Sequence, residues 1–201
     1  MTEIGMALSN PLDGERRPGY VGNALPGVDV RLVDEAGHLV VEGEPGLIQV
    51  RGPSVFNEYW GQPKETEATF TTDGWFITGD QAVVETGSYR ILGRSSVDIL
   101  KTGGEKISAL EIEEVLLTHP DIRECAVVGL PDVDWGDRVC AAIVSEGKDH
   151  LLVDELLAFA KKRLAPYKVP KEILLVSELP RNTMGKVTKP EVLKFFKPEK
   201  A

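Results

Sequence analysis

This chain is organised around one stretch, Leu179-Pro180-Arg181-Asn182-Thr183-Met184-Gly185-Lys186-Val187. It follows an apolar run, 173–176, that is typical of a buried strand. After it, Pro190 is a residue well tolerated in the first turn of a helix, and it predicts a short helix over 191–196. Lys186 is therefore expected on a loop between two regular elements. A lysine there is a mobile cation with three donors, suited to a phosphate or a carboxylate, although a solvated surface lysine has the same appearance.

Length and composition fit a globular protein of one large domain or two small ones. The chain has 201 residues, of which 42% are hydrophobic and 27% charged. No apolar run approaches the ~20 residues that cross a bilayer, so no membrane span is expected. The start, Met1-Thr2-Glu3-Ile4-Gly5, lacks the basic and apolar regions of a signal peptide and the Arg- and Ser-rich character of a transit peptide.

The net charge of −9 is unevenly distributed. Residues 1–160 carry 12 basic and 28 acidic side chains, a net of −16, whereas residues 161–201 carry 11 and 4, a net of +7. An acidic body without a basic, aromatic-interleaved stripe argues against nucleic acid as a partner. The positive charge of residues 161–201 is consistent with binding of a small anionic ligand. It is equally consistent with a solvated, lysine-rich terminus that binds nothing.

The cysteines and histidines do not form a reactive or metal-binding pattern. Cys125 and Cys140 both lie in strand-like runs, which predicts buried thiols in a reducing compartment. His38, His119 and His150 are isolated from one another, so no zinc-like cluster is expected.

Residues 1–93 are predicted to be mainly β. Runs 28–33 and 46–52 have the character of strands, and 63–70 begins with a proline and is predicted to be a short helix. Many short strands separated by glycine and proline turns indicate a small barrel or sandwich. Asp80 follows Thr-Gly at a strand end, where a carboxylate either caps a turn or accepts hydrogen bonds from a ribose diol.

Residues 98–201 are predicted to form a compact α+β domain. A strand over 98–101 leads into the tight turn Thr102-Gly103-Gly104, and Ser108-Ala109-Leu110-Glu111 is a capping box that opens a helix. The remaining expected elements are strands at 125–130 and 139–144 and an amphipathic helix at 153–164. The fold class is therefore α+β, with a small β-rich subdomain followed by this domain.

Taken together, these motifs resemble the adenylate-forming acyl-CoA synthetases, and the resemblance covers essentially the whole chain. The segments that carry it are Met1-Thr2-Glu3-Ile4-Gly5-Met6, Thr78-Gly79-Asp80, Gly93-Arg94, Lys101-Thr102-Gly103-Gly104 and the Lys186 stretch. By this resemblance Met1 is an interior methionine of a longer enzyme. Residues 1–93 are then the C-terminal part of the large AMP-binding domain, and 98–201 are the mobile C-terminal domain.

The resemblance implies a role for each candidate site residue. Lys186 is the catalytic residue, and Thr2, Asp80 and Arg94 contact the nucleotide. Glu3 helps to hold Mg²⁺. Lys101, Gly103 and Gly104 border the path of the CoA pantetheine. The implied cofactors are ATP, CoA and Mg²⁺.

The segment 94–97 is expected to be the hinge about which family members turn their C-terminal domain. The family places an Asp or Lys two residues after the arginine, but this chain has Ser96 there and one extra residue before the next acidic position. Either Ser96 or Val97 is therefore the pivot, and the sequence leaves both open.

Within the family the chain is most similar to malonyl-CoA synthetases of the animal mitochondrial type, through the run Ser96–Gly104, Pro53–Phe56 and Ala165–Tyr167. This implies an acid–CoA ligase that activates a short dicarboxylate, malonate or methylmalonate, in the mitochondrial matrix or the cytoplasm. The chain alone is expected to be inactive, because the family's phosphate loop belongs to the missing N-terminal part. Two alternatives stay open: a ligase of other acyl or aryl specificity, and a non-catalytic nucleotide-binding or interaction fragment.

Overall fold

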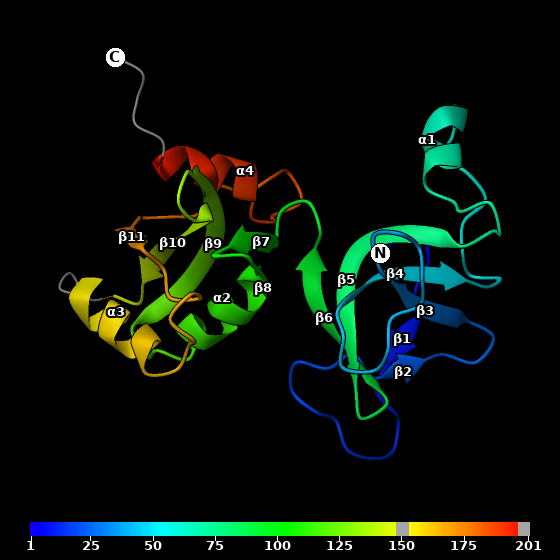
Figure 1. Ribbon diagram of the computed structural model, residues 1–201, viewed down its shortest axis with the longest axis horizontal. Helices are drawn as coiled ribbons and strands as arrows, with labels where there is room; N and C mark the ends of the chain where they lie inside the picture. Colours follow the sequence, from blue (N-terminus) through cyan, green and yellow to red (C-terminus); the bar gives the residue numbers. More distant parts are fainter. Residues whose placement is uncertain (148–152, 197–201) are drawn as a thin grey trace. The chain divides into compact units, whose positions relative to one another are not determined.

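The computed structural model describes residues 1–147 and 153–196, and the chain divides into two compact units, Met1–Ser95 and Ser96–Ala201. The division falls within the expected hinge segment 94–97, whose role as a pivot stays a prediction. Figure 1 shows the elements of both units in chain order. No helix in the described ranges is long and apolar enough to cross a membrane.

The first unit consists mainly of antiparallel strands. Its elements are β1 (Leu8–Ser9), β2 (Asn23–Ala24), β3 (Asp29–Val33), β4 (Gly46–Arg51), α1 (Pro63–Ala68), β5 (Phe76–Glu85) and β6 (Ser88–Arg94). β1 pairs with β2, and a separate four-stranded sheet has the order β3-β4-β5-β6. The β-rich character of this unit is as predicted; β3 and β6 do not pair with each other, and an isolated bridge joins Tyr89 of β6 to Gly22, just before β2.

One apolar cluster holds this sheet together. Leu32, Ile48, Val50 and Ala82 are buried in it, and Ala7 joins them from the N-terminal segment. The predicted helix over 63–70 is shorter than expected and ends at Ala68, because the chain turns there to form an isolated bridge between Phe70 and Phe76. Phe70 and Phe76 belong to an aromatic group with Phe56 and Tyr59.

The second unit is a five-stranded sheet with helices on both faces. Its elements are β7 (Ile99–Thr102), β8 (Glu105–Ser108), α2 (Ala109–Leu117), β9 (Ile122–Asp132), β10 (Gly136–Ser145), α3 (Val153–Lys161), β11 (Glu172–Leu175), α4 (Lys189–Val192) and the 3₁₀ helix η1 (Leu193–Phe196). The strand order is β11-β10-β7-β8, and β9 also pairs with β10. The predicted α+β class is thus confirmed.

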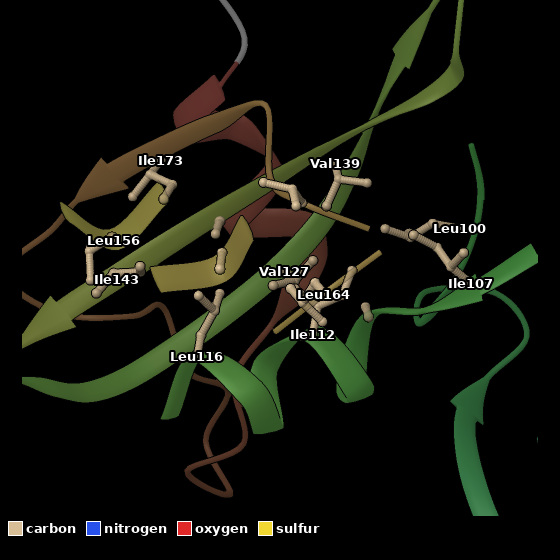
Figure 2. Packing of buried hydrophobic residues seen from close by; sticks show 14 of the residues in the cluster. Leu100, Ile107, Ile112, Leu116, Val127, Val139, Ile143, Leu156, Leu164 and Ile173 are labelled. Carbon is tan, nitrogen blue, oxygen red and sulfur yellow. The ribbon is translucent and has the colours of Figure 1, made fainter. Parts of the chain in front are cut away.

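Apolar side chains at successive positions of β9 and β10 explain why this sheet is covered by helices on both faces. Because successive side chains of a strand point to opposite faces, Val127 and Ala141 pack toward α2 and α3, whereas Val128 and Ala142 pack toward α4 and η1. Figure 2 shows the first of these clusters, with Ile112 and Leu116 of α2 below the strands. The two strands therefore belong to two apolar cores at once.

The observed helix ends agree only in part with those predicted from the sequence. The predicted cap of α2 is confirmed, because the Ser108 hydroxyl accepts a hydrogen bond from the Glu111 amide at 3.1 Å. α3 ends at Lys161 and not at Leu164, although the Leu164 side chain still lies buried in the first cluster. The predicted C-terminal helix begins two residues early, at Lys189, and its second half is 3₁₀. Strand β8, which the sequence analysis missed, completes a hairpin with β7.

Candidate functional site

Asp80 and Arg94 form a pair at one end of the first unit's sheet. They lie opposite each other in the β5–β6 register, and the Arg94 Nε lies 3.2 Å from the Asp80 Oδ1. The Thr78 hydroxyl accepts a hydrogen bond from the Asp80 amide at 3.1 Å and donates one to the Ile48 carbonyl at 3.0 Å. The backbone of Asp80 is thus fixed while its carboxylate, 27% exposed, faces solvent beside a cation.

Glu3 reaches the same group through a tyrosine. The Tyr59 hydroxyl donates a hydrogen bond to the Glu3 Oε1 at 3.2 Å, and the Glu3 carbonyl accepts one from the Phe56 amide at 2.7 Å. Burial raises the pKa of Tyr59, and the Glu3 charge adds to this effect while Arg94 opposes it. Glu3, Tyr59, Arg94 and Asp80 therefore form one connected electrostatic group within this unit.

A hollow of about 270 Å³ lies beside this group and is lined mostly by apolar side chains. Asp80 and Thr78 supply its polar edge, and Ile4, Met6 and Ile91 are among its apolar walls. Thr2 is exposed in the turn that precedes these residues. The segment 1–6 thus borders the hollow next to Asp80, as expected if it contacts a ligand held there.

Lys186 lies directly after the turn of a small hairpin in the second unit. Arg181 and Val187 bridge the two arms, and the Asn182 amide donates a hydrogen bond to the Lys186 carbonyl at 2.9 Å. The Asn182 Oδ1 accepts bonds from the amides of Met184 and Lys186 at 3.0 and 2.9 Å. Gly185 adopts φ +79°, which an L side chain tolerates poorly. These hydrogen bonds therefore hold the backbone that carries Lys186 in one conformation.

The arms of this hairpin are attached to the body of the unit. The Arg181 guanidinium donates to the Gly185 carbonyl at 2.7 Å and pairs with Glu124 on β9. The Thr188 amide donates to the Pro180 carbonyl at 2.8 Å. The Lys186 side chain is exposed, and no hydrogen bond or ion pair occupies its ammonium group among the residues described. The Lys186 ammonium group is therefore attached to a backbone held by hydrogen bonds and is available to an external anion.

The Gly103–Gly104 turn joins β7 to β8 and lies against an aromatic ring. Both glycines have positive φ, +58° and +84°. A Cβ at Gly103 would lie 3.5 Å from the Trp135 ring, and the Gly103 amide donates to the Trp135 carbonyl at 2.9 Å. The Lys171 ammonium group lies 4.4 Å from the centre of the same ring. Lys101 is exposed on β7, two residues before the turn.

The structure thus gathers Glu3, Asp80 and Arg94 in the first unit and sets Lys101 beside the glycine turn in the second. Sequence reasoning missed Tyr59, Trp135 and Lys171. The one available signal was the loop position of Trp135 between two strand-like runs. Nothing in the sequence pairs Tyr59 with Glu3, because that contact depends on the fold.

Few side chains in the described residues could serve as metal ligands. No group of three or more His, Cys, Asp or Glu side chains placed to hold a metal occurs in residues 1–147 and 153–196. Glu3 offers one carboxylate oxygen beside the one bonded to Tyr59. This fits Mg²⁺, which takes one or two carboxylates together with waters and substrate phosphates. It does not fit a cage built by protein ligands alone.

Comparisons with known proteins agree along the whole chain. The family model described as AMP-binding enzyme C-terminal domain matches residues 111–186, and the model described as AMP-binding enzyme matches residues 1–60. A mitochondrial malonate–CoA ligase, ACSF3, from Mus musculus is 52% identical over 98% of this chain. A malonate–CoA ligase from Arabidopsis thaliana is 48% identical over 96% of it.

Among solved structures, ATP-bound MatB from Rhodopseudomonas palustris is 42% identical, with a TM-score of 0.88 over 98% of this chain and 39% of its own. The chain spans 37% of the length of the mouse relative and 33% of the Arabidopsis one. The similarity therefore extends over almost the whole of this chain but over only 33–39% of each relative.

Proposed function

The chain belongs to the AMP-binding enzymes, and from that premise we propose that it is the C-terminal part of an ATP-dependent acid–CoA ligase. The observation that carries the proposal is Lys186, an exposed cation on a hairpin whose backbone is fixed by Asn182 and Arg181. An electrostatic catalyst needs this combination, because a charge held in place beforehand costs no reorganisation during the reaction.

We propose malonate or methylmalonate as the acid. The support is the similarity to malonate–CoA ligases along almost the entire chain and to the ATP-bound MatB structure. The reaction consumes ATP and the acid to give an acyl-adenylate and pyrophosphate. The CoA thiol then attacks the acyl carbon, and AMP leaves with the electron pair of the broken bond.

In the first step, negative charge develops at the α-phosphate as the carboxylate attacks it. The Lys186 ammonium group would neutralise this charge. Asp80 would accept hydrogen bonds from the ribose hydroxyls, and Arg94 would hold the Asp80 carboxylate in place and contact the nucleotide. Thr2 would lie close to the phosphate. The hollow lined by Ile4 and Met6 would border the acid.

Mg²⁺, when bound, would reduce the repulsion between the phosphates and the incoming carboxylate. Glu3 would supply one ligand oxygen, and Tyr59 would orient that carboxylate through its hydroxyl. This arrangement leaves the remaining ligand positions to waters and to the nucleotide.

In the second step the C-terminal unit would turn about residues 94–97, so that Lys186 leaves and the Gly103–Gly104 turn approaches. Two glycines allow an extended thiol ligand to pass close to the backbone. Lys101, Lys171 and Trp135 would line its path, the lysines toward phosphate groups and the ring toward apolar atoms. For location we propose the mitochondrion, as in the names of the ACSF3 relatives.

The test is CoA-thioester formation by the full-length enzyme with ATP and CoA saturating, comparing malonate, methylmalonate and butyrate. We expect kcat/KM for malonate to exceed that for butyrate by ~10⁴, because a site built for a distal carboxylate rejects a ligand that lacks it. Comparable values for malonate and butyrate would exclude the dicarboxylate and leave a ligase of other specificity. No thioester with any acid would exclude the ligase itself.

A further inference from the structure

Three charged side chains meet in the interior of the second unit. The Lys189 Nζ lies 2.5 Å from the Asp98 Oδ1 and 2.8 Å from the Glu113 Oε1. The three side chains are only 12–13% exposed. Two carboxyl groups therefore share one ammonium group where water has little access.

The members of this triad come from three places that matter for the proposed function. Asp98 directly follows the expected hinge and precedes β7. Glu113 lies on α2, and its Oε1 also accepts a hydrogen bond from the Val127 amide of β9 at 2.7 Å. Lys189 begins α4, three residues after Lys186. One ammonium group thus connects the hinge end, the central sheet and the end of the Lys186 hairpin.

A second observation links the triad to the hinge. Lys189 lines a hollow of about 240 Å³ together with Ser96 and Val97, the two candidate pivot residues. The Asp98 carbonyl, in addition, accepts a hydrogen bond from the Ala109 amide at 2.7 Å. The backbone just after the pivot is therefore fixed to the start of α2 on one side and to Lys189 on the other.

Stability alone does not account for burying these charges. Replacing a buried ion cluster by well-packed apolar side chains is often neutral or stabilising, because desolvation offsets the attraction. Burial raises the pKa of Glu113 even though Lys189 acts in the opposite direction, so desolvation is the larger effect here. What the triad provides is a fixed geometry among three elements.

We propose that Lys189 is a positioning residue for Lys186. Its bonds to Asp98 and Glu113 set the position of the Lys186 hairpin relative to the segment that follows the hinge. A turn about the hinge then carries the catalytic lysine through a defined displacement. This inference rests on the proposed function of Lys186 and extends it to a residue that touches no substrate.

The experiment compares Lys189→Met and Lys189→Arg in the full-length enzyme, with the two half-reactions measured separately. Lys189→Met should lower kcat for malonyl-adenylate formation by ~10- to 100-fold, because a displacement of about 1 Å can cost that much. Thioester formation from supplied malonyl-adenylate should change little, since Lys186 is absent from that step. Lys189→Arg keeps the charge and should restore most of the rate. Lys194→Met, at an exposed lysine paired only with Glu191 among the contacts described, is the matched control and should behave as wild type.

A second readout is independent of activity. Amide hydrogen exchange at Asn182 and Lys186 should be faster in Lys189→Met than in wild type, and unchanged in Lys194→Met. If Lys189→Met fails to fold because it removes the cation shared by two buried carboxylates, the triple variant Asp98→Asn, Glu113→Gln, Lys189→Met replaces it. That variant has neutral side chains of similar size and should show the same selective loss.

Lys186→Ala separates failure of this inference from failure of the proposed function. If Lys186→Ala abolishes adenylation but Lys189→Met adenylates at the wild-type rate, the positioning role is overturned and the ligase function stands. Equal losses in both half-reactions for Lys189→Met also overturn it, because they indicate general damage. If Lys186→Ala adenylates normally, the proposed role of Lys186 fails, and the inference fails with it.

Discussion

Asp80 faces Arg94 across the β5–β6 pair, with the Arg94 Nε 3.2 Å from the Asp80 Oδ1. The order of these two residues along the sequence was part of the resemblance to the family. Their contact, however, results from the antiparallel register of β5 and β6. Under the proposed function, Asp80 would accept hydrogen bonds from the ribose diol, and Arg94 beside it would contact the nucleotide. Substitutions at Asp80 therefore test nucleotide binding directly.

Asp80→Asn in the full-length enzyme should raise the KM for ATP by ~10- to 100-fold, because hydrogen bonds to a charged acceptor contribute about 1.5–3 kcal/mol. The measurement is ATP–pyrophosphate exchange with the acid saturating. Asp73→Asn is the matched control, since Asp73 pairs with Arg31 at 3.0 Å in the same unit and is 56% exposed. Equal effects from the two substitutions would contradict a specific role for Asp80.

Lys186→Ala should lower the rate of adenylate formation by ~10²–10³, the usual cost of losing one focused donor. Thioester formation from a supplied acyl-adenylate should be largely spared. Both half-reactions are followed in single-turnover experiments. A similar loss in both would remove the argument that Lys186 leaves before the thiol arrives.

Gly103→Ala should impair thioester formation more than adenylation. The added methyl group would lie in ordinary contact with the Trp135 ring, at 3.5 Å, but the backbone φ of +58° is one that an L side chain tolerates poorly, so the turn is strained. The strain is of the order of 1–2 kcal/mol. Gly74→Ala, with φ +83° and open space around it, controls for backbone strain elsewhere in the chain. Unchanged thioester kinetics in Gly103→Ala would argue against a thiol path along this turn.

Limited trypsin digestion of the 201-residue chain should cut first after Arg94 and leave a resistant C-terminal piece. Arg94 is 57% exposed, and the second unit has its own two apolar clusters. The first unit has a single, smaller apolar cluster and is therefore expected to be less stable. Arg94→Gln should abolish this cut. Loss of both parts at one rate would count against independent folding of residues 98–201.

The two thiols should be unreactive in the folded chain near neutral pH. Burial raises the pKa of Cys140 to about 11 and raises that of Cys125 further. Because the thiolate is the reactive form, a pKa of about 11 leaves on the order of one molecule in a thousand ionised at pH 8. Iodoacetamide labelling should therefore be slow, should rise with pH, and should become fast in urea. Rapid labelling of native protein at pH 8 would be inconsistent with the buried strands.

The sequence predicted those features that depend on neighbours along the chain. The Ser108 cap of α2, the Gly103–Gly104 turn and the Lys186 loop all follow from residue types within a few positions. The strand order β3-β4-β5-β6 and the bridge from Gly22 to Tyr89 could not be predicted, because short strands and turns do not specify which edges pair.

Contacts between distant segments could not be read from the sequence. Lys189 meets Asp98 across 91 positions, and Tyr59 meets Glu3 across 56. A helical pattern also gave no sign that α3 ends before Leu164, since that side chain stays buried after the helix has ended. Such features arise from packing, which local propensity does not encode.

The double role of β9 and β10 has a consequence for biosynthesis. The cover of one face of these strands is completed when Val192 and Phe196 pack against Val128 and Cys140. Until Val192 and Phe196 have been synthesised, that cover is incomplete, and two long apolar strands are partly available to other nascent chains. We therefore expect truncation before Val192 to yield aggregated protein, whose rescue depends on chaperones and not on substrate.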